Sequence, residues 1–150
     1  MAIWFLDHVA DPNRQCSIDV TPLSMAVANA PFSIIQTLFG RGGDVQNGEL
    51  LQHALDRQAD VVDVLAFLLE KGASLNKTMY QDHPWAWRIF LFSGLGTPLH
   101  KAAKLGKLDA VEFLLSQVQI LALWIGSAVL LWNGCRQVSG KPSPHWRVLE

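Results

Sequence analysis

The sequence predicts an all-α protein built from antiparallel pairs of short helices. In several separate segments, apolar residues recur at the spacing of one helix face. Threonine–proline pairs stand at two points where helices are expected to begin. The chain also repeats itself, since TPLSMAVA at 21–28 aligns with TPLHKAAK at 97–104. Half of the 150 residues are hydrophobic, which is enough for one domain with a sizeable core.

The first helix of two pairs has a recognisable start. Thr21 and Thr97 can cap a helix, because a threonine hydroxyl accepts a hydrogen bond from the free N–H groups of the first turn. Pro22 and Pro98 follow at the first helical position, where a missing N–H costs nothing. Gly106 can adopt the left-handed conformation that ends the later helix. A helix this short needs neighbours to become stable.

A second apolar-patterned segment follows each first helix, at 33–43, 64–73 and 110–117. Counted back from Gly42 and Gly72, apolar residues lie eight, seven, four and three positions earlier, which is the spacing of one helix face. These glycines stand where the chain is expected to turn in a left-handed conformation.

The middle copy, at 47–58, matches less well. Glu49 and Leu50 stand where the other copies have threonine and proline. Two extra residues also separate its two helices, and Asp60 is a candidate N-cap for the second one.

Thr-Pro-Leu-His-x-Ala, followed by a helix ending in Leu-Leu-x-x-Gly, resembles the ankyrin repeat. The resemblance covers roughly residues 1–117 and implies a solenoid of antiparallel helix pairs. Its expected parts are a partial repeat at 1–17, repeats at about 18–46, 47–76 and 95–117, and an insertion at 77–94.

In the ankyrin family the motif histidine is structural, so the resemblance implies that His100 bonds to the turn backbone and to Thr97. A catalytic role would need a nucleophile or carboxylate partner, and the sequence indicates none. Cys16, His53, His100 and Cys135 lack the spacing of a metal site. We therefore expect no enzyme activity, no cofactor and no bound metal.

The insertion, KTMYQDHPWAWRIFLFSG at 77–94, is rich in aromatic residues. Asp82 could cap a short helix, Pro84 could open it and Gly94 could close it. The rings could pack on the repeats or contact a partner. Tryptophan and arginine are enriched at binding hot spots, so the candidate contact residues are Tyr80, Trp85, Trp87 and Arg88. Helical spacing puts Trp85 and Arg88 on a partner-facing side, and we expect Phe90 and Leu91 to pack onto the repeats.

After residue 117 the repeat pattern stops, and residues 118–132 form an apolar run without charge. Three explanations remain open: an extra helix that covers the end of the stack, a membrane segment, or a truncated array with a foreign tail. A spanning helix needs about 20 apolar residues, which favours a packed helix at 118–133. Residues 134–150 read as a flexible tail.

The charge balance and the N-terminal sequence limit the possible partners and cellular locations. Twelve basic and thirteen acidic residues nearly balance, which argues against a nucleic-acid partner. The N-terminus lacks the basic region of a signal peptide, and the two cysteines lie far apart, so a cytoplasmic or nuclear location is expected. The resemblance implies a non-catalytic module that binds another protein through its concave face and the 77–94 loop. The alternative is a membrane-tethered ankyrin protein anchored by residues 118–132.

Overall fold

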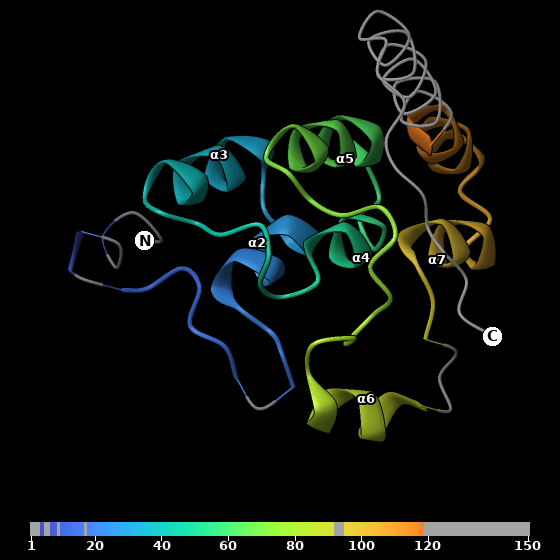
Figure 1. The fold of residues 1–150 in the computed structure, drawn as a ribbon. Coiled ribbons are helices and arrows are strands. Elements are labelled where there is room, and N and C mark those ends of the chain that lie inside the picture. Colours follow the sequence, from blue (N-terminus) through green and yellow to red (C-terminus); the bar gives the residue numbers. More distant parts are fainter. Residues whose placement is uncertain (1–3, 5–6, 9, 17, 92–94, 119–150) are drawn as a thin grey trace, which may run out of the picture. The chain divides into compact units, whose positions relative to one another are not determined.

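The computed structural model describes residues 4, 7–8, 10–16, 18–91 and 95–118 (Figure 1). Throughout these residues the regular structure is helical and there is no strand, which confirms the predicted all-α class. Met1–Leu115 form one compact unit, to which all the contacts described below belong, and Ser116–Glu150 form another.

The helices of the first unit come in pairs along the chain. Their bounds are α2 Pro22–Asn29, α3 Phe32–Gly40, α4 Leu50–Ala54, α5 Val61–Glu70, α6 Pro84–Phe90 and α7 Pro98–Lys104, and residues 108–115 of this unit are also helical. Helix α2 packs against α3 and α4, and α4 packs against α5 and α7. Consequently α2, α4 and α7 form a first-helix row, and α3 and α5 lie in a second row (Figure 1).

The core lies between the two rows. The predicted apolar face of α3 supplies Ile35 and Leu38, and that of α5 supplies Val64, Leu65 and Leu68, all of them buried. The first-helix row contributes the facing residues Leu23, Val27, Leu50, Leu51, Ala54 and Ala102. Burying one such large aliphatic side chain stabilises the fold by about 1.5–3 kcal/mol. The apolar contacts in this core therefore hold neighbouring helices together.

The helix ends largely follow the sequence signals. Thr21 caps α2, and its hydroxyl accepts a hydrogen bond from the Ser24 N–H at 3.0 Å. Gly42, Gly72 and Gly106 have φ angles of 91°, 95° and 67°, so the left-handed turns are confirmed. The prediction for Asp60 is only half right. It stands at the N-cap of α5, but its side chain makes no capping bond, and its carboxylate instead accepts a hydrogen bond from Arg57 Nη2 at 3.1 Å.

The longer connection of the middle copy positions Arg57. From this loop, Arg57 Nη1 donates hydrogen bonds to the carbonyl oxygens of Val27 at 2.7 Å and Ala30 at 2.9 Å. These carbonyls end helix α2, where they have no partner within the helix. The extra residues therefore allow one side chain to join two consecutive helix pairs.

The predicted C-terminal helix at 118–133 and tail at 134–150 lie outside the described residues, except for Val118. Both therefore stay predictions, as does the alternative of a membrane segment at 118–132. Within the described part of the chain, no helix has the length and apolar character needed to cross a bilayer.

Candidate interaction surface

The insertion, residues 77–94, carries α6 and is called the finger below. Pro84 opens this helix as predicted, but the capping prediction for Asp82 was wrong. The Asp82 carboxylate instead lies 3.1 Å from Lys77 Nζ, and His83 Nδ1 accepts the capping hydrogen bond from the Ala86 N–H at 3.2 Å. Gly94, the predicted end of the helix, lies outside the described residues.

The inner side of α6 is packed against the start of the finger. Ala86 is buried, and the half-buried Phe90 ring stacks on Tyr80 with 5.1 Å between ring centroids. Tyr80 was a candidate partner-contacting residue, but its side chain is buried and is not offered at the surface. Its ring instead holds the inner side of the helix in place.

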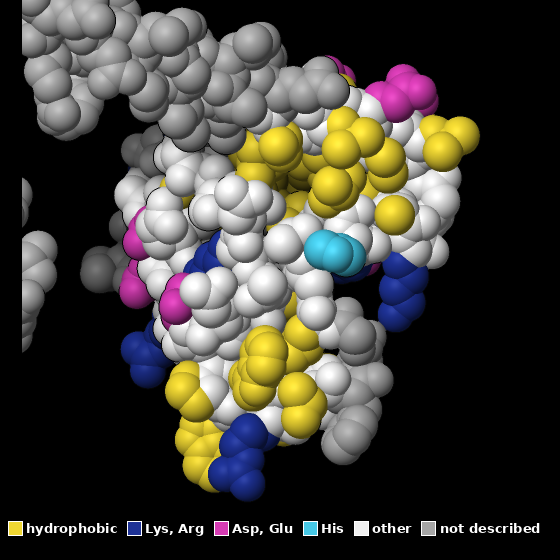
Figure 2. All heavy atoms as spheres, turned by 45° about the vertical axis from the view of Figure 1, so that its right-hand side comes forward, with side chains coloured by type: hydrophobic (Ala, Val, Ile, Leu, Met, Phe, Trp, Pro, Cys, Tyr) yellow, Lys and Arg dark blue, Asp and Glu magenta, His cyan; other side chains and the backbone are white. Residues whose placement is uncertain are grey.

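The outer side of α6 is apolar and exposed. Trp85 is 71 % exposed and Ile89 is 58 % exposed, and Arg88 is exposed beside them. The three share one helix face because they are three and four positions apart. Figure 2 shows hydrophobic side chains, with a basic residue among them, gathered at the lower end of the view, where Figure 1 has α6.

The exposure of Trp87 and Leu91, which lie between the inner and outer sides of α6, agrees only in part with the prediction. Trp87 is 38 % exposed and remains accessible, but Leu91 is 48 % exposed, so the prediction that it packs onto the repeats was wrong. Successive helical residues diverge by about 100°, which turns Leu91 away from the side where Phe90 meets Tyr80. Ile89 was missed as a candidate, although its spacing of four residues from Trp85 was a usable signal.

The start of the finger is fixed by Glu49. This buried carboxylate accepts a hydrogen bond from the Tyr80 N–H at 3.1 Å, and its Oε1 lies 3.7 Å from Lys77 Nζ. Burial raises the pKa of Glu49, and the Lys77 charge and the Tyr80 N–H offset this only in part. The pKa of Lys77 is also raised. Burial lowers it, but the hydrogen bond to Asp82 and the charge of Glu49 outweigh that effect.

The end of the finger is fixed by Gln52. Its Nε2 donates a hydrogen bond to the carbonyl oxygen of Gly96 at 2.9 Å, 44 residues further along the chain. The same carbonyl accepts a bond from the Met79 N–H at 3.1 Å, which ties the two ends of the finger together. The finger therefore has a fixed base and an exposed apolar side.

A family model described as "Ankyrin repeat" matches residues 96–123, which include α7 and the helical segment after it. This part of the chain is therefore an ankyrin repeat. No curated protein and no solved structure matches the chain. The ankyrin-repeat family is generally non-catalytic, and its members generally bind other proteins.

The matched repeat shows the predicted threonine–histidine contact. Thr97 Oγ1 and His100 Nδ1 are 2.8 Å apart, and Pro98 occupies the first turn of α7. Thr97 makes no side-chain capping bond, so its hydroxyl serves the histidine ring instead. In α2 the serine at the histidine position, Ser24, completes a capping box with Thr21.

The middle copy uses the same two motif positions differently. Glu49 takes the threonine position and Gln52 takes the histidine position, and these are the two side chains that hold the finger. Its weak match to the ankyrin motif thus has a structural counterpart. The residues that depart from the motif bind an insertion that the other copies do not have.

The first-helix row beside the finger carries the polar side chains of His53 and Lys101. Lys101 Nζ lies 2.8 Å from the Asp56 carboxylate and donates a bond to the Gln52 carbonyl at 2.7 Å. His53 Nε2 is buried and has no hydrogen-bond partner among the described residues. Burial, reinforced by the Lys101 charge, lowers the pKa of His53 below its usual 6.5.

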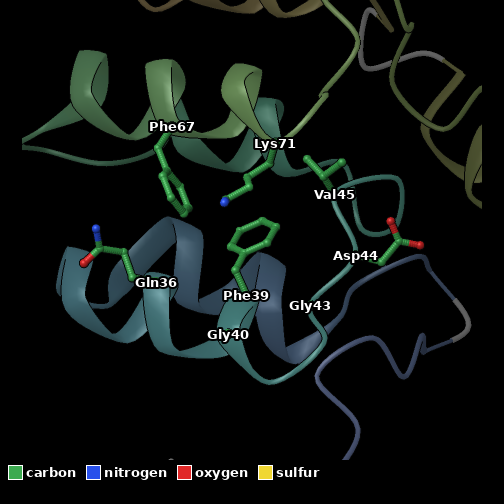
Figure 3. Close-up of a pocket in the computed structure, with 8 residues that line it drawn as sticks. All are labelled: Gln36, Phe39, Gly40, Gly43, Asp44, Val45, Phe67 and Lys71. Carbon is green, nitrogen blue, oxygen red and sulfur yellow. The ribbon is translucent and has the colours of Figure 1, made fainter.

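An open groove of about 490 Å³ lies between α3 and α5 (Figure 3). Phe39 and Phe67 meet edge to face in it, with 5.3 Å between centroids, and Lys71 Nζ stands 5.2 Å from the Phe67 centroid. This groove belongs to the second row of helices rather than to the finger. Among the described residues, no group of three or more histidine, cysteine, aspartate or glutamate side chains could hold a metal ion.

Proposed function

We propose that this ankyrin-repeat protein is a non-catalytic interaction module. It binds a protein partner through the outer side of the finger, with the neighbouring first-helix row as the rest of the surface. The observation that carries the proposal is the exposure of Trp85 and Ile89 on a helix whose inner side is packed. Large apolar side chains gathered at one exposed site are typical of interaction surfaces.

The finger also has the energetic features of a binding hot spot. Truncating a tryptophan or arginine at the centre of an interface can cost about 2 kcal/mol or more, which is roughly 30-fold in affinity. Glu49 and Gln52 hold the finger before any partner arrives. Less conformational entropy is then lost on binding, because the helix is already placed.

The proposal is tested by affinity capture with the full chain as bait. The variant is the double substitution of Trp85→Ala and Arg88→Ala, and Leu108→Ala is the control, because Leu108 is 72 % exposed but lies outside the finger. We expect wild type and control to capture the same protein, identified by mass spectrometry and confirmed with the purified partner. The double variant should lose it while its melting temperature stays within a few degrees of wild type.

Two results would contradict the proposal. Unchanged capture by the double variant would mean that the finger does not bind. A collapse of its melting temperature would mean that Trp85 and Arg88 serve the fold rather than a partner.

A further inference from the structure

We infer that the partner presents an acidic side chain flanked by apolar residues, and that its carboxylate binds Arg88 on the helix face that also carries Trp85 and Ile89. This inference rests on the proposed function, because it specifies the chemistry of the partner at the same surface. It is carried by the charge distribution of the finger and by the hydrogen bonds that this arginine does not make within the described chain.

Arg88 is the only charged residue between His83 and Leu91 when histidine is neutral. The nearest acidic residue in sequence, Asp82, already pairs with Lys77 at 3.1 Å. None of the ion pairs among the described residues includes Arg88. The outer side of α6 therefore carries one positive charge that has no carboxylate partner in the part of the chain that the structure describes.

The neighbours of Arg88 favour a carboxylate over other ligands. A guanidinium binds a carboxylate with two parallel hydrogen bonds, which gives both affinity and orientation. Trp85 and Ile89 lie on the same helix face and would exclude water from the pair once covered by apolar partner residues. Exclusion of water strengthens a charged hydrogen bond, and it penalises a partner that leaves Arg88 unpaired.

Two other occupants fit the surface less well. A second copy that paired finger to finger would bring two Arg88 side chains together, with no acidic residue between His83 and Leu91 to separate them. A lipid surface favours a helix with a strongly charged face opposite its apolar face. The side of α6 that carries Phe90 is instead packed against Tyr80 and carries no charge.

The test uses a random 12-residue peptide library displayed on phage and selected against the full chain. Peptides that also bind the Trp85→Ala, Arg88→Ala double variant are removed. We expect the remaining peptides to share an aspartate or glutamate next to aromatic or aliphatic residues. For a synthetic peptide of this kind, Arg88→Gln and the glutamate-to-glutamine peptide should each weaken binding by about 10- to 100-fold. The two changes together should weaken it little more than either alone.

A charge exchange makes the test sharper. The Arg88→Glu variant should not bind the acidic peptide. It should bind a peptide in which lysine replaces the acidic residue, and should do so more tightly than the wild-type protein does. Arg88 is exposed, so these variants should keep the wild-type melting temperature, and Leu108→Ala should bind the acidic peptide normally.

The outcomes separate this inference from the proposed function. Selected peptides that need Trp85 but lack an acidic residue, or that bind Arg88→Gln as well as wild type, would overturn the inference and leave the protein-binding function standing. A selection in which no peptide depends on either residue would overturn both. Trp85-dependent binding to phosphatidylcholine–phosphatidylserine vesicles, without selected peptides, would assign the finger to a lipid surface and also overturn both.

Discussion

At the scale of single residues, one motif position makes a different hydrogen bond in each helix pair. Ser24 bonds within its own first turn, and His100 contacts Thr97 three residues before it. Gln52 instead reaches the carbonyl of Gly96. The length and donor type of the side chain therefore decide whether the position serves its own helix or a distant segment.

The first prediction concerns His100. We expect His100→Ala to lower the free energy of unfolding by about 1 kcal/mol, because the variant loses the hydrogen bond to Thr97. Partner affinity should stay almost unchanged. Urea unfolding and a binding titration measure the two effects separately. A variant with wild-type stability but lost binding would show that His100 serves recognition instead.

The second prediction concerns His53 and pH. We expect the free energy of unfolding to fall as the pH drops below about 6.5, because the unfolded chain then binds a proton that the folded protein does not accept. Stability falls in this direction because the pKa of the His53 imidazole is lowered in the folded protein. Burial and the Lys101 charge lower this pKa, and the charges of Asp56 and Asp19 offset the effect only in part. The loss should level off below the pKa of the folded state, where both states are protonated.

His53→Gln removes the titrating group and should flatten this part of the pH profile. Urea unfolding of wild type and variant at pH 7.5, 6.5 and 5.5 measures the difference. Parallel profiles for the two proteins would show that His53 does not contribute.

At the scale of the element, α6 is a short helix that other parts of the chain hold in place. Isolated helices of this length are not stable in water. The stacking of Phe90 on Tyr80 stabilises the inner side of the helix, and the hydrogen bonds of Glu49 and Gln52 stabilise the base of the finger. The exposed outer side therefore adds little to the stability of the fold and is free to serve binding.

The third prediction concerns the base of the finger. Glu49→Ala leaves the buried Tyr80 N–H without its acceptor and should cost about 1–3 kcal/mol. Glu49→Gln keeps an oxygen acceptor for this N–H and removes a carboxyl group whose pKa is raised by burial. The stability of this variant at pH 7 should therefore stay near that of wild type. Faster amide hydrogen exchange at Tyr80 is expected in the alanine variant alone. Equal behaviour of the two variants would contradict this role for Glu49.

At the scale of the whole repeat unit, the loop between α4 and α5 joins three consecutive helix pairs. Arg57 binds the carbonyls at the end of α2, and Lys107 binds the Arg57 carbonyl from the side of α7. Lys101 adds a pair with Asp56. In repeat proteins the contacts between neighbours determine how cooperatively the array unfolds. This polar loop should therefore control cooperativity as well as stability.

The fourth prediction tests that coupling. Arg57→Met keeps much of the apolar stem but removes the donors to Val27 and Ala30, so we expect a loss of about 1–3 kcal/mol. The urea transition should also broaden, because the helix pairs are less well coupled. Arg41→Met is the matched control, since its pair with Asp7 is exposed and should contribute under about 1 kcal/mol. Similar losses in both variants would contradict a special role for Arg57.

The sequence by itself determined the helices, their order and most of their ends. Apolar spacing, helix-start residues such as Thr21 and Pro22, and turn glycines such as Gly42 and Gly72 act over one or two turns of chain. Local sterics and local hydrogen bonds fix these features, so they can be read without knowing the packing. Trp85 and Arg88, which the same local logic assigned to a partner-facing side of the insertion, are both exposed.

Only the tertiary structure decided which groups hold the finger and which of its rings are hidden. Glu49 meets Tyr80 across 31 residues and Gln52 meets Gly96 across 44, and no local spacing encodes such pairs. The same packing buries Tyr80 and leaves Leu91 exposed, against expectation. The physical reason is that burial depends on which surfaces the packed helix pairs bring together. Residue type sets only a preference for burial, which the geometry of the neighbours then satisfies or overrides.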